Sequence, residues 1–158
     1  MLPALLFPFA VAFLLSMALT PFTIIFARKF KLVDDPKTHN RPAVIHKKPL
    51  PRAGGVPIFF AIILAMALFL PNDKTFLSII AAGALVVIIG ILDDKYDLSP
   101  YVRFLGNLVS AAIVVFSGVE IPFITNPLGG ILSFTNFSFS FLSVDFTIST
   151  ILAIIWIV

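Results

Sequence analysis

Three carboxylates, Asp93, Asp94 and Asp97, follow directly after the apolar run 76–92. Desolvating an ionised carboxylate costs free energy unless a cation or hydrogen-bond donors receive it. Mg²⁺ prefers carboxylates together with phosphate oxygens and water. On a helical continuation, Asp93 and Asp97 share a face, as do Asp94 and Asp97. The pattern indicates a divalent-cation or phosphate-handling site at a membrane surface. The alternative is that these acids only end the apolar segment and anchor it among lipid headgroups.

A basic segment could face these acids. Eight of the eleven Lys and Arg residues lie between Arg28 and Arg52. Arg offers a bidentate fork to phosphate and Lys a point charge, and Gly54-Gly55 would let backbone N–H groups approach an anion where the next helix starts. The basic and glycine residues concerned are His39, Arg41, His46, Lys47, Lys48, Arg52, Gly54 and Gly55. The alternatives are the positive-inside signal of a cytoplasmic loop and attraction to anionic headgroups.

Composition favours an integral membrane protein. Of the 158 residues, 59% are hydrophobic and 12% charged, whereas a soluble domain carries roughly 25% charged residues. The absence of cysteine excludes disulfides and thiolate metal sites. The sequence predicts one all-α membrane domain over residues 1–158, with four full transmembrane helices and a truncated fifth. The expected spans are 2–27, 54–71, 75–92, 102–119 and 146–158. Since the last run is too short to cross a bilayer, we expect an N-terminal fragment of a longer protein.

Counting the crossings predicts the sides of the membrane. With the basic loop 28–53 inside, the loop 93–101 also lies inside, so the acidic and basic residues face the same compartment. The N-terminus and segment 120–145 then lie outside the cell (plasma or inner) membrane. In that outer segment, the turn 126–130 and the alternation Phe137-Ser138-Phe139-Ser140-Phe141 favour an external β-hairpin. An irregular aromatic loop is the alternative.

Two motifs carry a resemblance to a known family. Segments 34–37 and 46–55, ending in Pro51-Arg52-Ala53-Gly54-Gly55, resemble the first cytoplasmic motif of the polyprenyl-phosphate N-acetylhexosamine-1-phosphate transferases, of the glycosyltransferase family 4 type. Segment 90–100, followed by 103–107, resembles their second motif. The first motif is closer to the WecA/TagO branch than to the MraY branch, which typically carries Thr before x-Gly-Gly. The two motifs also occur in the family's order.

The resemblance implies an enzyme. A UDP-N-acetylhexosamine would give its sugar 1-phosphate to undecaprenyl or another polyprenyl phosphate in cell-envelope glycan biosynthesis, releasing UMP, with Mg²⁺ (or Mn²⁺) as cofactor. Asp93 and Asp94 would be catalytic and would bind the metal, with a further ligand expected downstream of Val158. The residues implied to bind substrate or phosphate are His46, Lys47, Arg52, Gly54, Gly55, Asp97 and Arg103.

The family's later motifs, which complete the metal and nucleotide sites, are expected after the fifth helix and are not in this sequence. The chain alone is therefore expected to be inactive. The implied partners are the lipid phosphate, the UDP-sugar and the membrane, with no nucleic acid, and a homodimer is compatible with them. The alternative function is a non-catalytic membrane module, either half of a transporter or a headgroup-binding anchor. Transporters place charges near the midplane, whereas nearly all charges here fall in loops.

Overall fold

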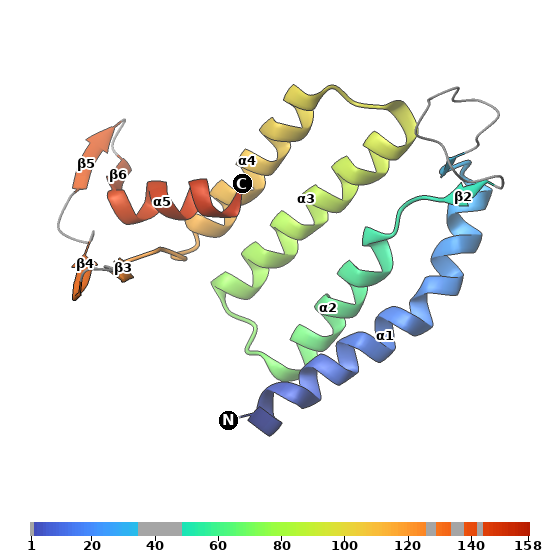
Figure 1. Cartoon of the computed structure of the whole chain (residues 1–158), viewed down its shortest axis with the longest axis horizontal. Helices are drawn as coiled ribbons and strands as arrows, with labels where there is room; N and C mark the ends of the chain where they lie inside the picture. Colours follow the sequence, from blue (N-terminus) through green and yellow to red (C-terminus); the bar gives the residue numbers. More distant parts are fainter. Residues whose placement is uncertain (1, 35–48, 126–128, 134–137, 142–143) are drawn as a thin grey trace.

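The structure is mostly helical, as predicted. The computed structural model describes residues 2–34, 49–125, 129–133, 138–141 and 144–158. Its helices are α1 (Leu2–Lys29), α2 (Gly55–Phe69), α3 (Lys74–Tyr96), α4 (Pro100–Val115) and α5 (Ile148–Ile157). Helices α1 to α4 lie side by side and alternate in direction, while α5 packs against α4 (Figure 1). The connections α1–α2 and α3–α4 therefore lie at the same end of the helices.

Within the described ranges of the chain, two helices are long and apolar enough to cross a membrane. These are α1, over Leu6–Lys29, and α3. Large apolar side chains remain exposed along the helices, among them Phe7 (66%), Phe22 (70%) and Leu68 (68%), as expected for surfaces that face lipid.

The remaining helices are shorter than predicted. At 1.5 Å per residue, the 15 residues of α2 cover about 22 Å, less than the roughly 30 Å of a hydrocarbon core. The prediction ran from 54 to 71, but Leu70 turns to an extended conformation before Pro71, which cannot continue the hydrogen-bonding pattern. The span predicted over 102–119 corresponds to α4. This helix ends at Val115, ahead of Gly118, which has φ +110°.

The acidic residues belong to a helix and not to a loop. Helix α3 was expected to stop near Leu92, with a polar loop over 93–101, but it continues to Tyr96. Asp97 ends it in the left-handed conformation, φ 53°, and its N–H donates to the carbonyl of Asp93. Carboxylates are compatible with a helix once it has left the apolar layer, so the last apolar residue does not mark its end. Helix α4 also begins early, with Ser99 as its N-cap and Pro100 in its first turn.

Small residues let α3 and α4 approach closely. A Cβ added to Gly106 of α4 would lie 2.1 Å from Cδ1 of Ile89 on α3, so the helices pack where only a hydrogen fits. At the far end, the hydroxyls of Ser78 and Ser117 are 2.8 Å apart and hydrogen-bonded. The relative position of α3 and α4 is thus fixed along most of their length.

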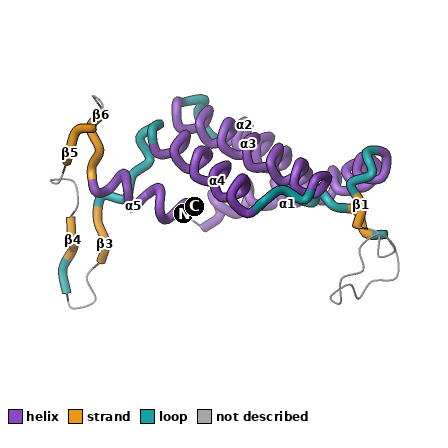
Figure 2. Tube along the Cα trace, turned by 90° about the horizontal axis from the view of Figure 1, so that it is seen from above, coloured by secondary structure: helices purple, strands orange, loops and turns teal. Residues whose placement is uncertain are grey.

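The described residues of segment 120–147 form two strand pairs, where the sequence predicted one hairpin over 120–145. Strand β3 (Phe123–Thr125) pairs with β4 (Ile131–Ser133) around the predicted turn, and β5 (Ser138–Phe141) pairs with β6 (Val144–Thr147), both antiparallel. Residues Ser138–Phe141 of the Phe/Ser alternation therefore form a strand, and their partner β6 crosses the predicted boundary between the outer segment 120–145 and the fifth span 146–158. Thr147 caps α5, which starts two residues later than expected. Figure 2 shows both pairs at the end of the molecule opposite β1.

Candidate active site at the ends of helices α1 to α4

The connection between α1 and α2 is held at its base. Two short strands, β1 (Val33–Asp34) and β2 (Leu50–Pro51), pair antiparallel. Beside them, the N–H of Arg52 donates to the carbonyl of Leu32 over 2.8 Å. Leu32 itself is 1% exposed, and its own N–H donates to Ala27 at the end of α1. Because a fully buried leucine fixes this strand pair to α1, the backbone of Arg52 has a defined position.

Ala53 joins the two sequence motifs. Its side chain is buried against Ala27 and Leu32, and Val56 and Ile91 pack on the same cluster. Its backbone has φ +70°, a left-handed conformation that costs a residue with a Cβ about 1–2 kcal/mol. Its N–H donates to Oδ2 of Asp94 over 2.8 Å, across 41 residues of sequence. The acidic end of α3 and the start of α2 are therefore in direct contact, as the predicted topology required.

Asp93 has different partners from its neighbour. Its Oδ2 lies 3.2 Å from Nη1 of Arg103, in the first turn of α4. The other oxygen, Oδ1, is buried and has no hydrogen-bond partner among the described residues. A buried carboxylate oxygen without a donor is costly, so Oδ1 is a position where a bound cation or a ligand donor would lower the free energy.

The donor set fits a hard cation only in part. Oxygen from Asp93 is the kind of ligand that Mg²⁺ takes. However, the described part of the chain contains no group of three or more His, Asp or Glu side chains that could hold a metal ion. Asp94, predicted as a second ligand, has one of its oxygens engaged by Ala53. The described residues therefore supply one well-placed carboxylate, and further ligands must come from elsewhere.

The glycines lie at the N-terminus of α2. Gly54 is its N-cap, with φ −61°, and Gly55 is its first residue. Neither has a positive φ, and a Cβ added to either would meet nothing within 4 Å. Neither backbone strain nor packing within the described chain explains why these residues are glycine. Open space before the first N–H groups of a helix is suited to an anion that approaches the backbone.

The other predicted residues are placed as follows. The side chain of Asp97 is exposed beyond the helix end, and its backbone caps α3. Arg103 is paired with Asp93, so its guanidinium lies at the acidic end of α3. His46 and Lys47 lie outside the described residues. The sequence interpretation missed Ala53 and Leu32, because an alanine between motif residues and a leucine after a basic run give no chemical signal.

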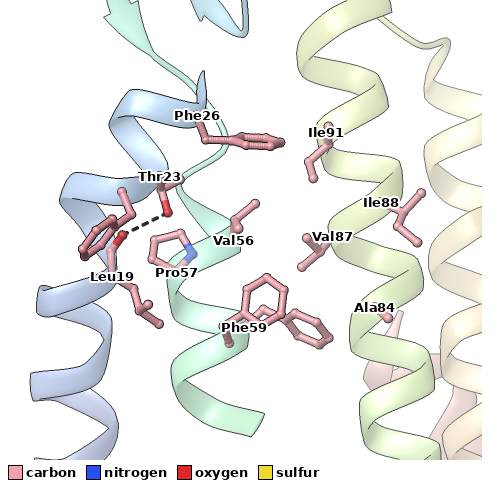
Figure 3. A pocket seen from close by; sticks show the side chains of 12 residues that line it. Leu19, Thr23, Phe26, Val56, Pro57, Phe59, Ala84, Val87, Ile88 and Ile91 are labelled. Carbon is pink, nitrogen blue, oxygen red and sulfur yellow. Dashed lines mark hydrogen bonds between the residues drawn. The ribbon is translucent and has the colours of Figure 1, made fainter. Parts of the chain in front are cut away.

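An apolar cavity lies next to this site. It has a volume of about 610 Å³ and opens between α1, α2 and α3. In Figure 3, Phe26 of α1 points toward Ile91 of α3, while Val56 and Pro57 of α2 lie between the two helices. The only hydroxyl in its lining, that of Thr23, donates to the carbonyl of Leu19. The lining residues therefore expose almost no polar group to the cavity, which is suited to an apolar chain.

A smaller cavity of about 260 Å³ lies between α1 and the start of α2, next to Arg52. It is lined by Arg52 and Gly54, and it shares Thr23 and Pro57 with the larger cavity. An amphipathic molecule could thus place an anionic head near Arg52 and an apolar tail along α1 and α3. Fold and site together define a helical membrane protein with a polar site where four helix ends meet.

Comparisons with known proteins agree with this description. The sequence profile of glycosyl transferase family 4 matches residues 76–158, more than half of the chain. The chain therefore belongs to glycosyl transferase family 4, which confirms the resemblance seen in the two motifs. No solved structure matches the chain.

Similar curated proteins carry related names. A probable undecaprenyl-phosphate N-acetylglucosaminyl 1-phosphate transferase of Bacillus subtilis is 34% identical over 120 residues, which cover 75% of this chain and 32% of that protein. An undecaprenyl-phosphate alpha-N-acetylglucosaminyl 1-phosphate transferase of Yersinia pestis is 32% identical over 108 residues, 68% of this chain and 28% of its own length. A decaprenyl-phosphate N-acetylglucosaminephosphotransferase of Mycobacterium leprae is 29% identical over 98 residues, 55% and 24% respectively. The chain thus spans about a quarter to a third of these relatives.

Proposed function

We propose that this protein transfers an N-acetylhexosamine 1-phosphate group from a UDP-sugar to a polyprenyl phosphate. The names of the relatives support the reaction class. The observation that carries the proposal is the contact between Asp94 and Ala53, because it places the acidic end of α3 against the glycine N-terminus of α2. A phosphate-handling reaction needs carboxylate and anion-binding groups side by side.

In this reaction an oxygen of the lipid phosphate attacks the sugar-bearing phosphorus of the UDP-sugar. One P–O bond forms, the P–O bond to UMP breaks, and UMP leaves. The described residues with suitable positions are Asp93, whose Oδ1 is buried without a partner, and Arg103, which holds the other oxygen. Asp93 would hold or orient the attacking phosphate group, and Arg52 and the N–H groups after Gly54 would bind phosphate oxygens.

A divalent cation is part of this proposal. Mg²⁺, or Mn²⁺, would neutralise phosphate charge, and Asp93 is the described residue best suited to bind it. The remaining ligands and most of the nucleotide site are proposed to lie outside this chain. The 158-residue chain alone is accordingly proposed to be inactive.

The membrane arrangement follows the same logic. We propose four crossings by α1 to α4, with the bilayer thinned locally around the shorter α2 and α4, the N-terminus outside and the site at the cytoplasmic face of the plasma membrane. The cavity between α1 and α3 would then receive the first isoprene units of the lipid, while the phosphate would lie near Arg52, which lines the smaller cavity. The water-soluble UDP-sugar would approach from the cytoplasm.

The test is a transfer assay with the purified full-length protein. Undecaprenyl phosphate, radiolabelled UDP-N-acetylglucosamine and Mg²⁺ should yield a lipid-soluble labelled product and UMP, and EDTA should stop the reaction. Asp93→Asn should lower the rate by about a hundredfold or more. Glu120→Gln, at the opposite end of the helices, is the matched control and should retain the rate. A pure, folded full-length protein that forms no lipid-linked sugar from any UDP-N-acetylhexosamine would refute the proposal.

A further inference from the structure

The adjacent aspartates point to different groups. Successive residues of an α-helix are about 100° apart around its axis, so the side chains of Asp93 and Asp94 leave α3 in different directions. Asp93 lies toward α4 and bonds to Arg103, whereas Asp94 lies toward α2 and accepts the N–H of Ala53. A shared catalytic role for the pair does not follow from this arrangement.

The Ala53 contact bears on a strained point of the chain. Ala53 has φ +70°, although it lacks the conformational freedom that lets glycine adopt such a value. The left-handed conformation lets the chain pass from Arg52, bonded to Leu32, into the first turn of α2. A charge-assisted hydrogen bond from a carboxylate is among the stronger ones available to a backbone N–H. The bond therefore opposes relaxation of Ala53 toward the ordinary region of φ, which would redirect both Arg52 and Gly54.

We infer that Asp94 is a positioning residue, which holds Arg52 and the N-terminus of α2 in place through the backbone N–H of Ala53, while Asp93 alone of the pair acts on the reacting groups. The inference rests on the proposed function for what is being positioned. The bond itself and the strain at Ala53 are independent of that function.

Asparagine separates the two roles. An Asn carbonyl oxygen can still accept the N–H of Ala53, but it cannot serve as a base or an anionic ligand. In the full-length protein, Asp94→Asn should stay within about tenfold of the wild-type rate, while Asp93→Asn falls by about a hundredfold or more. Asp94→Ala, which removes the acceptor, should lose about a hundredfold through misplacement of the phosphate-binding groups.

A second substitution tests the strain directly. Glycine adopts positive φ readily, so Ala53→Gly should hold the turn with less help from residue 94. In the Asp94→Ala background, adding Ala53→Gly should recover a measurable part of the lost activity. In the wild-type background it should change little, because the bond to Asp94 is already present.

Trypsin cleavage after Arg52 reports on the same turn and does not depend on transferase activity. Opening of the turn exposes the bond between Arg52 and Ala53, so the peptide that ends at Arg52 should appear faster in Asp94→Ala, at the wild-type rate in Asp94→Asn, and at an intermediate rate in the double variant. The matched control is Asp73→Ala at the other end of α3, where Oδ1 accepts the N–H of Phe76 over 2.7 Å. Losing that bond should leave cleavage after Arg52 unchanged.

Two results would overturn the inference. In the first, the transfer rate of Asp94→Asn falls as far as that of Asp93→Asn, while trypsin cleavage after Arg52 stays slow. This result would place Asp94 at the reacting atoms. The other is unchanged cleavage in Asp94→Ala. If instead the wild type makes no lipid-linked sugar but the cleavage rates follow the expected order, the proposed function fails and the positioning role stands.

Discussion

Asp93 of α3 and Arg103 of α4 form an ion pair, with 3.2 Å between Oδ2 and Nη1, that leaves Oδ1 as the buried oxygen without a partner among the described residues. The Arg103 side chain is 46% exposed, and exposed ion pairs contribute about 0–1 kcal/mol to stability. The ion pair therefore mainly orients the Asp93 carboxylate and contributes little to the stability of the fold.

Replacing Arg103 should separate these effects. Arg103→Ala should lower transfer by about tenfold or more, because Asp93 loses the group that fixes its rotamer, while the melting temperature changes by only a few degrees. Arg103→Lys keeps the charge without the planar fork and should lie in between. Initial rates and thermal unfolding in detergent measure the two effects. A large loss of stability with an unchanged rate at low temperature would contradict the orienting role.

Replacing the glycines at the start of α2 by alanine should impair substrate binding without lowering stability. Since an added Cβ meets nothing at Gly54 or Gly55 and neither φ is positive, alanine should leave the melting temperature unchanged or raise it slightly. If the open space admits a phosphate, Gly54→Ala and Gly55→Ala should raise KM for a substrate. Equal KM values with a higher melting temperature would show that this space is not used by a ligand.

Filling the apolar cavity should affect the lipid and not the sugar. Ala84 lines the cavity on α3, and Ala84→Phe should project a ring into it. We expect a higher KM for undecaprenyl phosphate, a smaller change for a short-chain prenyl phosphate, and an unchanged KM for the UDP-sugar. Leu6→Phe, at an exposed position near the far end of α1, serves as the control for added bulk. An equal rise in KM for both lipids would mean that the prenyl chain binds elsewhere.

The close approach of α3 and α4 predicts a compensating pair. Gly106→Ala would bring Cβ within 2.1 Å of Ile89 Cδ1, and overpacking of this kind costs about 1–3 kcal/mol. Ile89→Val removes that terminal methyl. The double variant should therefore melt at a higher temperature than Gly106→Ala alone, and double-mutant analysis should give a coupling between the sites. Additive effects would mean that Ile89 moves aside at no cost.

These 158 residues contain no cysteine, so single introduced cysteines, with any cysteine of the remaining chain replaced, can test the proposed sidedness. Asn72 lies in the α2–α3 connection, and Tyr101, which is 85% exposed, lies at the start of α4. In intact cells, an impermeant maleimide should label Asn72→Cys, whereas Tyr101→Cys should react only after permeabilisation. Labelling of both from outside would refute the four-crossing arrangement and with it the cytoplasmic site.

The sequence predicted the helices and the meeting of the two motifs, because both depend on apolar run length and on the number of crossings. Helix ends were less accurate. Asp93 and Asp94 were assigned to a loop, since hydropathy marks where a helix leaves lipid and not where its hydrogen bonds end. The pairing of β5 with β6 was missed because the Phe/Ser alternation identifies a strand without identifying its partner.

The division between the two aspartates could not be predicted from their types. Which way each carboxylate points depends on the rotation of α3 about its axis, and that rotation is set by contacts such as Gly106 with Ile89. The importance of Ala53 was equally invisible, because only its backbone participates. Sequence patterns report side-chain chemistry, whereas this contact uses an N–H that nearly every residue has.

The clamp formed by Leu32, Arg52 and the β1–β2 pair closes segment 35–48 at its base. Enlarging a loop whose ends are already pinned adds only a small, slowly growing entropic cost. A segment of different length between Asp34 and Leu50 should therefore change the free energy of folding only slightly, while the anchored base keeps Arg52 and the N-terminus of α2 in place.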